Sequence, residues 1–480
     1  MAISVSPNSV RANVRGITVN GQLSSTGTPR RFLVALALTA SACTASSPSV
    51  VSVDWATAYQ TIDGFGAASN ETSFVEPLSD EMMDFFFTTK GIGLSLLRIR
   101  DYPSVRDCES DTGAGACVRR DGGTLLQTDL QIARMALARG VRIWSSQWSP
   151  PGSMKENHDF TKGGAMIGTS ENYRALASIR AGYVAYMREQ GIPLVALSAQ
   201  NEPDMSMWYP SATWTPEQIH DFVPYLHDAL QATGSADTKI MIAEESRWAG
   251  RWPWSDSFSF AAPAMRDPAV AARVGIVAAH NYDQLNPSSP PKLPNVTTQR
   301  IWQTEASTFE SFDGSMMNAL IWAERIHAFV SLARVNAFHY WYLTAGPNDR
   351  DNQVLVAGDG RIARRAYVFG NWSRFVRPGW HQVAVRSPRG LLVTAFRNDR
   401  GDQSAIVAIN AGATPAAPRF AIGDVAPTVT PWVTSSARAL EAQPAFTVTG
   451  GSFVYTMPAQ SVVTFVGTSA PIDQDASVPE

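Results

Sequence analysis

Short apolar runs alternate with longer segments of helical periodicity through most of this chain of 480 residues. Runs of about four to eight residues that are mainly apolar and lack a helical period are typical of strands buried on both faces of a sheet. We expect eight such strands, at residues 62–68, 94–100, 142–148, 194–201, 239–245, 274–282, 300–305 and 336–343. Helical patterns are found at residues 80–90, 125–139, 171–190, 216–233, 316–334 and 363–375. This alternation predicts an α/β fold, a (β/α)8 TIM barrel.

The pattern changes after Gly379. Six short strands, separated by Gly, Pro, Asn and Asp, replace the alternation and predict a side β-sandwich domain. An isolated strand at residues 51–59 is expected to join that domain. We therefore divide the chain into an export signal (1–43), a tether with the first strand of the side domain (44–60), a catalytic barrel (61–378), the β-sandwich (379–468) and a loose tail (469–480).

Composition argues against several kinds of protein. Apolar residues make up 45% of the chain and charged residues 17%, as in a well-cored globular protein and unlike a disordered one. The net charge of −3 and the absence of basic runs argue against a nucleic-acid partner. The seven histidines show no metal-ligand spacing, so we expect neither a catalytic metal nor another cofactor. We expect a monomer, whose 14 tryptophans provide material for stacking on sugar rings.

The N-terminal region has the pattern of an export signal. A basic pair, Arg30-Arg31, precedes a short apolar run and small residues that end at Cys43. Residues 40–43 resemble a bacterial lipobox, in which the cysteine is lipidated, although Ala40 stands where leucine is usual. The two alternatives are a protein tethered to the membrane at the cell envelope and a protein that is cleaved and secreted.

The two remaining cysteines are consistent with export. Cys108 and Cys117 flank a short loop rich in small residues. In an oxidising compartment such a pair is expected to form a disulfide, and the alternative is two free thiols.

Two glutamates end predicted core strands and are candidates for catalysis. Glu202 closes one run and is followed by Pro203, which is expected to hold it in an extended conformation. Glu305 closes the strand 300–305 in the same way. TIM-barrel enzymes keep their chemistry at the carboxyl ends of the strands, where two carboxyl groups can divide the roles of acid and nucleophile in glycoside hydrolysis. The alternative is that each glutamate caps a helix or pairs with an arginine, but two glutamates in equivalent places favour catalysis.

Six stretches in this order resemble glycoside hydrolase family 30. They are residues 60–66, 96–100, 148–155, 198–203, 302–305 and 375–379. The resemblance covers residues 51–466 and implies a (β/α)8 barrel with a side β-sandwich built from both chain ends. It also implies a retaining mechanism, in which Glu202 matches the acid/base and Glu305 matches the nucleophile.

The resemblance assigns two further residues to the reacting groups. Asn201 matches the asparagine that holds the sugar 2-hydroxyl, with a strand-end amide that satisfies backbone groups as the alternative. Arg98 matches the arginine that keeps Glu305 ionised. Arg100 lies on the same face of the strand and is the alternative to Arg98.

Four more residues are expected around the sugar. Tyr282 matches a tyrosine that hydrogen-bonds the nucleophile, and His280 shares its face and either lines the site or is a satisfied core histidine. Trp148 and Trp341 match aromatic walls of the sugar pocket, with plain core packing as the alternative.

The resemblance leaves several substrates open. Residues 336–343 are closer to the xylanase and galactanase branches of the family than to the glucosylceramidases. Arg350 follows the last strand, where glucuronoxylan-specific members carry basic residues, but its surroundings depart from that branch. We expect an endo-acting β-1,4-xylanase with a polysaccharide substrate. The alternatives are an endo-β-1,6-galactanase, a β-1,6-glucanase, a glucosylceramidase and a non-catalytic carbohydrate-binding protein of the cell envelope.

Overall fold

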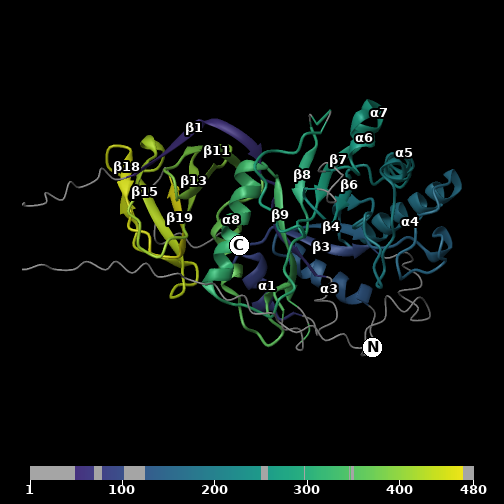
Figure 1. Cartoon of the computed structure of the whole chain (residues 1–480), viewed down its shortest axis with the longest axis horizontal. Helices are drawn as coiled ribbons and strands as arrows, with labels where there is room; N and C mark the ends of the chain where they lie inside the picture. Colours follow the sequence, from purple (N-terminus) through teal and green to yellow (C-terminus); the bar gives the residue numbers. More distant parts are fainter. Residues whose placement is uncertain are drawn as a thin grey trace, which may run out of the picture. The chain divides into compact units, whose positions relative to one another are not determined.

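A closed parallel barrel is the main feature of the structure, a computed structural model that describes residues 49–69, 78–101, 125–249, 258–293, 295–296, 298–344, 346 and 351–468. Its strands are β2 (Gly64–Ala68), β3 (Leu96–Asp101), β4 (Arg142–Gln147), β5 (Leu194–Ser198), β6 (Lys239–Glu245), β7 (Val274–Ala279), β8 (Arg300–Gln303) and β9 (Ala337–Thr344). Each strand pairs with the next, and β9 pairs with both β8 and β2, which closes the ring (Figure 1). A short further strand, β10 (Val354–Val356), pairs with β9. The predicted (β/α)8 barrel is confirmed.

Apolar side chains from successive strands fill the barrel interior. Leu96, Trp144, Ala196, Met241 and Ile276 come from β3 to β7 and belong to one buried cluster. Layers of inward-pointing residues are the usual filling of such a barrel, which is a packed core and not a pore.

A buried histidine on β9 requires a glycine opposite it on β2. A Cβ atom on Gly66 would lie 2.5 Å from Cδ2 of His339, too close for any side chain. The Trp144 indole can only donate, so His339 Nε2 accepts from it (3.1 Å) and His339 Nδ1 donates to Gln303 O (2.9 Å). Burial lowers the pKa of His339 to about 3, and its ring is therefore a neutral part of the barrel core.

The predicted helices are present around the barrel. They are α1 (Asp80–Phe87), α3 (Leu125–Leu137), α4 (Ser170–Glu189), α5 (Pro216–Ala232), α8 (Met316–His327) and α9 (Arg364–Ser373), and two short helices, α6 (Ala262–Arg266) and α7 (Pro268–Ala271), lie where the sequence shows no clear pattern. Helix α5 begins with a capping box, in which Thr215 and Gln218 satisfy each other's backbone N–H groups. The predicted helix 316–334 is α-helical only as far as His327 and continues as a π-helical turn, η3 (Ala328–Leu332).

The C-terminal strands and the N-terminal strand build a separate β domain. Strand β1 (Val50–Thr61) pairs antiparallel with β11 (His381–Arg386) and parallel with β14 (Arg419–Ala421). The other strands are β12 (Leu392–Arg397), β13 (Gln403–Asn410), β15 (Thr428–Thr434), β16 (Glu441–Ala442), β17 (Phe446–Thr447), β18 (Ser452–Val454) and β19 (Ser461–Thr468). They form one hydrogen-bonded sheet that curls around its own apolar core (Figure 1). The predicted fold class, a TIM barrel with a side β domain, is confirmed.

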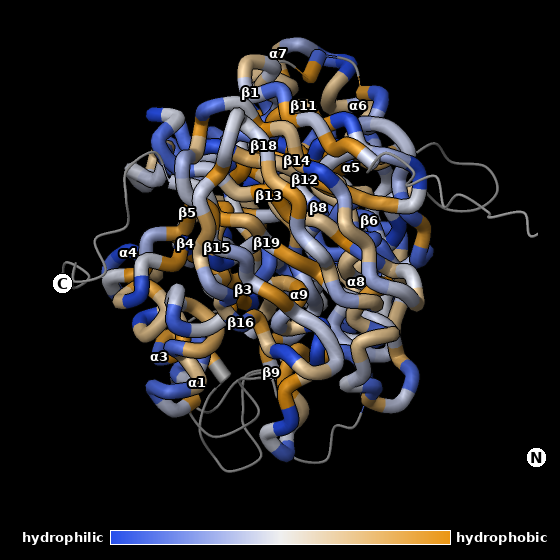
Figure 2. Tube along the Cα trace, turned by 90° about the vertical axis from the view of Figure 1, so that its left-hand side faces the viewer, coloured by the Kyte–Doolittle hydropathy of each residue, from blue (hydrophilic) through white to orange (hydrophobic). Residues whose placement is uncertain are grey.

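Helix α9 joins this sheet to the barrel. Asn371 Nδ2 donates to Thr464 Oγ1 (3.0 Å), and Trp372 Nε1 donates to Thr394 Oγ1 (3.1 Å), both in buried positions. Hydrophobic residues gather along strands such as β13 and β19, whereas the outer loops are largely hydrophilic (Figure 2).

Several predictions concern residues outside the described part of the chain. They are the export signal with Cys43, the Cys108–Cys117 disulfide, Arg350 and the tail 469–480, and they stay predictions. Within the described residues, no helix combines the length and apolar character that a membrane crossing requires.

Candidate active site

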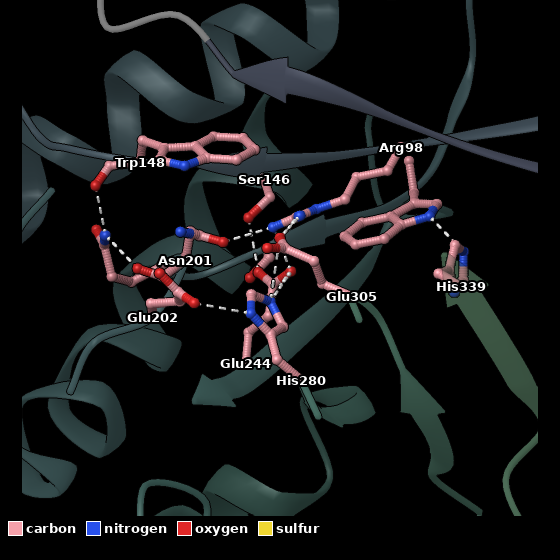
Figure 3. Close-up of polar contacts among 12 residues, drawn as sticks. Arg98, Ser146, Trp148, Asn201, Glu202, Glu244, His280, Glu305 and His339 are labelled. Atoms are coloured by element: carbon pink, nitrogen blue, oxygen red, sulfur yellow. Dashed lines mark hydrogen bonds and ion pairs between the residues drawn. The ribbon is translucent and has the colours of Figure 1, made fainter. Parts of the chain in front are cut away.

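Two glutamates meet at the carboxyl end of the barrel. Glu202 follows β5 and Glu305 follows β8, and both side chains are buried. One carboxylate oxygen of each, together with one ring nitrogen of His280, lie within 4.8 Å of one another. Figure 3 shows these side chains converging with Arg98 and Glu244. The structure therefore brings together the two acids that the sequence places at strand ends far apart in the chain.

Glu202 does not have the extended backbone predicted from Pro203. Its φ angle is 43°, in the left-handed region, and β5 ends at Ser198 instead of the predicted residue 201. The N–H of Glu202 donates to the carbonyl of Glu244 (3.0 Å), and the N–H of Asn201 donates to that of Gln147 (2.8 Å). The prediction was wrong because these bonds to the neighbouring strands outweigh the local preference of a residue before proline.

Arg98 connects the reacting groups. It is fully buried, and its Nη1 donates to Glu305 Oε2 while its Nη2 donates to Asn201 Oδ1 (2.5 Å) and to Glu244 Oε1 (2.8 Å). Burial lowers the pKa of Arg98, but the charges of Glu244 and Glu305 raise it to a higher value than usual. Arg98, and not Arg100, is thus the arginine beside Glu305.

His280 lies between three carboxylates. Its Nδ1 is 3.1 Å from Glu202 Oε1, and its Nε2 is 3.5 Å from Glu244 Oε1 and 3.6 Å from Glu305 Oε2. Burial lowers the pKa of His280, but the charge of Glu305 and the contacts with Glu202 and Glu244 raise it to about 10. The ring is therefore an imidazolium at neutral pH that donates from both nitrogens, and it faces the site.

Opposing effects act on Glu305. Burial and the charge of Glu202 hold its pKa above the usual value of a glutamate, although the positive charges of His280 and Arg98 and the Tyr282 hydroxyl act to lower it. The Tyr282 hydroxyl donates to Glu305 Oε1 (2.6 Å), so both carboxylate oxygens accept a hydrogen bond. Contacts of this kind favour the ionised carboxylate.

Trp148 and Trp341 form an aromatic side of the site. Their ring centroids are 6.0 Å apart, and the guanidinium carbon of Arg98 lies 4.7 Å and 5.3 Å from them. Trp341 also stacks on Tyr342, with centroids 4.1 Å apart. Trp148 is half-buried and Trp341 is 8% exposed, so Trp148 presents more of its ring to a ligand.

Sequence reasoning missed Glu244 and Ser146. Glu244 lies at the end of β6, and its carboxylate accepts from Arg98 and from Ser146 Oγ (2.6 Å). The positive charge of Arg98 and the hydrogen bond from His280 outweigh burial and lower the pKa of Glu244 to about 2. A signal was present, because the predicted strand 239–245 ends in two adjacent carboxylates.

Tyr209 is a third residue that the sequence did not mark. Its hydroxyl contacts the Glu202 carboxylate, and burial together with the charge of Glu202 raises the pKa of Tyr209. It lies in the loop that follows Pro203, where no pattern distinguishes it from other loop aromatics.

Glu202, His280 and Glu305 would also be a conceivable set of metal ligands, since each offers one oxygen or nitrogen atom. The three carboxylates around His280 favour its protonated form, however, and a metal would have to displace that proton before it could bind the ring. Arg98 further supplies a positive charge at Glu305, where a cation would bind. Among the described residues, this arrangement suits ion pairs better than a metal.

Arg180 fixes the strand end that carries Glu202. It is buried on α4, its Nε donates to Asp101 Oδ2 (2.8 Å), and its two Nη groups donate to the carbonyls of Ala199 (2.6 Å) and Ser198 (2.5 Å). We expect Arg180→Met to lower the free energy of unfolding by about 3–5 kcal/mol, because it leaves a buried carboxyl and two carbonyls without their partner. Urea denaturation measures this change.

Arg188 on the same helix provides the matched control. It pairs with Asp237 at the surface, where both side chains are well exposed. We expect Arg188→Ala to cost less than about 1 kcal/mol. Equal losses in the two variants would show that the buried pair has no special part in holding the end of β5.

Comparisons with known proteins show the family of this chain. The model for the Glycosyl hydrolase family 30 TIM-barrel domain matches residues 61–315. Glucuronoxylanase XynC from Bacillus subtilis (strain 168) is 28% identical over 349 residues, which cover 70% of this chain and 76% of that protein.

Solved structures share the fold. The glycoside hydrolase family 30 subfamily 8 xylanase Xyn30A from Clostridium acetobutylicum superposes with a TM-score of 0.74 at 28% identity, covering 87% of this chain and 99% of that chain. The endo-beta1,6-glucanase BT3312 superposes with a TM-score of 0.66 at 18% identity, covering 88% of this chain and 96% of that chain, and this likeness shows the fold alone.

Proposed function

This chain belongs to glycoside hydrolase family 30, and from that premise we propose that it is a retaining endo-β-1,4-xylanase. The observation that carries the retaining mechanism is the approach of Glu202 and Glu305. One carboxylate oxygen of Glu202 and one of Glu305 lie within 4.8 Å of each other. Retaining glycosidases hold their two carboxyl groups about 5–5.5 Å apart, whereas inverting ones leave about 6.5–9.5 Å for a water molecule.

In the first step, Glu305 attacks the anomeric carbon and Glu202 gives its proton to the departing glycosidic oxygen. The contacts of Glu305 with Arg98 and Tyr282 orient its carboxylate for this attack. The Asn201 amide oxygen is used by Arg98, so its NH2 group is the part that can donate to a sugar hydroxyl.

In the second step, Glu202 removes a proton from water, and the resulting oxygen attacks the anomeric carbon and releases Glu305. The rings of Trp148 and Trp341 support a sugar through apolar contact while these polar groups act on its reacting side. The product keeps the β configuration of the bond that was cleaved.

Xylan is the proposed substrate because relatives at 28% identity, one a glucuronoxylanase and one a xylanase, span most of the chain. We also propose that the chain is exported, as its N-terminal pattern predicts, since a polymer of the plant cell wall lies outside the cell that degrades it.

The test is a product profile. The purified protein is incubated separately with glucuronoxylan, arabinoxylan, β-1,6-galactan, β-1,6-glucan and glucosylceramide, and the first product is followed by NMR. We expect xylo-oligosaccharides whose reducing end first appears as the β-anomer. Galactobiose, gentiobiose or ceramide as the sole product would overturn the substrate, and a first α-anomer would overturn the mechanism. Binding without any hydrolysis would favour a carbohydrate-binding protein.

An exposed tryptophan next to Tyr209, the residue whose hydroxyl contacts Glu202, leads to a prediction about the length of the substrate. Trp208 is 80% exposed, and its ring packs edge-on against Tyr209, with centroids 5.5 Å apart. The loop is held in place because Ser211 Oγ accepts from the N–H of Met207 (3.0 Å), and Lys155 Nζ donates to the carbonyl of Ser211 (2.8 Å). The loop thus presents the exposed Trp208 ring next to Tyr209, whose hydroxyl contacts Glu202.

We expect Trp208→Ala to lower kcat/KM on xylan by about 10-fold, because it removes an aromatic surface on which a leaving sugar stacks. Activity on an aryl xyloside, whose leaving group is not a sugar, should change little. Val454→Ala removes another exposed apolar side chain, from the side β domain, and serves as the control. An equal loss on both substrates would contradict a role in binding the leaving sugar.

A further inference from the structure

A third carboxylate lies behind the two reacting ones. Glu244 is fully buried, so it does not contact a sugar, yet it touches both cations of the site: Arg98 Nη2 at 2.8 Å and His280 Nε2 at 3.5 Å. Its other oxygen accepts from Ser146 Oγ at 2.6 Å. Figure 3 shows Glu244 and His280 side by side beneath Arg98 and Glu305.

The backbone at Glu244 is strained. Ala243 and Glu244 have φ angles of 70° and 50°, and the pairing of β6 with β7 shifts register between Ala243 and Glu245. A left-handed conformation costs a residue other than glycine about 1–3 kcal/mol and persists where the surroundings enforce it. Such irregular pairings occur often beside active sites, where they redirect a side chain. Here the irregularity accompanies the placement of a carboxylate against two cations.

The proposed reaction moves a negative charge across the site. When Glu305 bonds to the anomeric carbon, its carboxylate becomes a neutral ester. In the same step Glu202 loses its proton to the leaving oxygen and becomes negative. Arg98 and His280 keep their positive charges throughout, but the anion between them at Glu305 has gone. Glu244 is the anion that remains in contact with both.

We propose that Glu244 is a positioning residue whose permanent negative charge holds Arg98 and protonated His280 in place while Glu305 is esterified. This inference rests on the proposed function. It assigns to Glu244 a negative charge that persists while Glu305 is an ester. Glu244 stays ionised through the working range of pH, since its pKa is lowered to about 2. It thereby keeps Arg98 and His280 hydrogen-bonded in the positions that they need when the second step releases Glu305 as a carboxylate.

Several charged groups share this environment, and the test must separate Glu244 from them. The titratable groups that interact with Glu244, or with the two cations that it holds, are Arg98, Arg180, Glu202, His280, Tyr282, Glu305 and His339. The neutral Ser146 hydroxyl contributes a hydrogen bond without a charge.

The first experiment compares Glu244→Gln with Glu244→Asp on 4-nitrophenyl β-xylobioside and on xylan. We expect Glu244→Gln to lower kcat/KM by about 100-fold and to move the alkaline limb of its pH profile down by about one pH unit, because removing an anion makes nearby protons easier to lose. Glu244→Asp keeps the charge and should leave that limb at the wild-type pH, whatever its rate. If the alkaline limb of the Glu244→Gln profile lies at the wild-type pH, the inference is overturned. Activity of the wild-type protein on these substrates would still support the proposed function.

Glu245→Gln is the matched control. This neighbouring carboxyl contacts Ser259 Oγ (3.2 Å) and not the two cations, and burial raises its pKa to about 8, so it is neutral below that pH. Neutralising it permanently should leave the pH profile below pH 8 unchanged.

A second measurement does not depend on activity. The ¹⁵N signals of the histidine rings are followed against pH in the wild type, Glu244→Gln and Glu245→Gln, with His280 assigned from a His280→Asn variant. We expect the titration midpoint of His280 to fall by at least about one pH unit in Glu244→Gln alone. An unchanged midpoint of His280 would overturn the inference, whether or not the chain cleaves any of the sugars tested. A wild-type protein that cleaves none of them would refute the proposed function instead.

Discussion

Replacing Glu305 with glutamine is expected to lower kcat on xylan by about 10⁴-fold or more, because the variant cannot form the covalent intermediate on which the proposed double displacement depends. The substitution keeps the size of the side chain and one oxygen that can accept from either Arg98 or Tyr282, while an NH2 group replaces the other acceptor. Initial rates on xylan measure the loss, and circular dichroism shows whether the fold is kept.

A second variant, with a shorter side chain at position 305, tests whether Glu305 is the nucleophile. Glu305→Ala leaves space beside the anomeric carbon, and azide is expected to enter and give an α-xylosyl azide from an activated aryl xyloside. Glu245→Gln, which alters a carboxyl that contacts neither Glu202 nor Glu305, should retain wild-type activity. Substantial hydrolysis by Glu305→Gln, or a β-azide from Glu305→Ala, would contradict the assignment of the nucleophile.

The meeting of the two glutamates follows from features that are visible in the sequence. Each follows an apolar strand, and the carboxyl ends of parallel barrel strands face the same side, so residues distant in the chain converge there. The same argument applies to Asn201 and Tyr282, which lie shortly beyond the ends of strands β5 and β7. The positions of the strands and their order were enough to predict the barrel and its two strand-end glutamates, whereas the other site residues were expected from the resemblance to glycoside hydrolase family 30.

The parts that were missed depend on local backbone geometry. Regular alternation along a strand predicts which residues share a face, but the irregular pairing at Ala243 changes where the following side chains lie. Glu244 therefore reaches Arg98 through a conformation that has no signature in the residue types. The left-handed turn at Glu202 was missed for the same reason, since its cause is a hydrogen bond to a neighbouring strand.

The protonation of His280 could not be predicted from its position in the strand either. Its state depends on three carboxylates from β5, β6 and β8, and one of these, Glu244, was itself not foreseen. A histidine among apolar residues such as His339 is neutral, whereas His280 is an imidazolium, although both lie in the strands of the same barrel. The difference in protonation between His339 and His280 follows from the three carboxylates that surround His280.

Replacing Glu202 with alanine is expected to have an effect that depends on the leaving group. On xylan the loss should be about 10²–10⁴-fold, because a sugar leaves poorly without a proton from the general acid. On 2,4-dinitrophenyl β-xylobioside the first step needs no such proton, so the covalent intermediate forms and then accumulates. Mass spectrometry of the quenched reaction should detect the protein with the disaccharide attached to Glu305.

Azide distinguishes the acid/base from the nucleophile by the product that it gives. In Glu202→Ala, azide can attack the covalent intermediate from the side that Glu202 leaves open, and the expected product is a β-xylosyl azide with turnover restored. Undiminished hydrolysis of xylan by Glu202→Ala, or an α-azide, would show that another group donates the proton, and Tyr209, whose hydroxyl contacts Glu202, would be the next residue to replace.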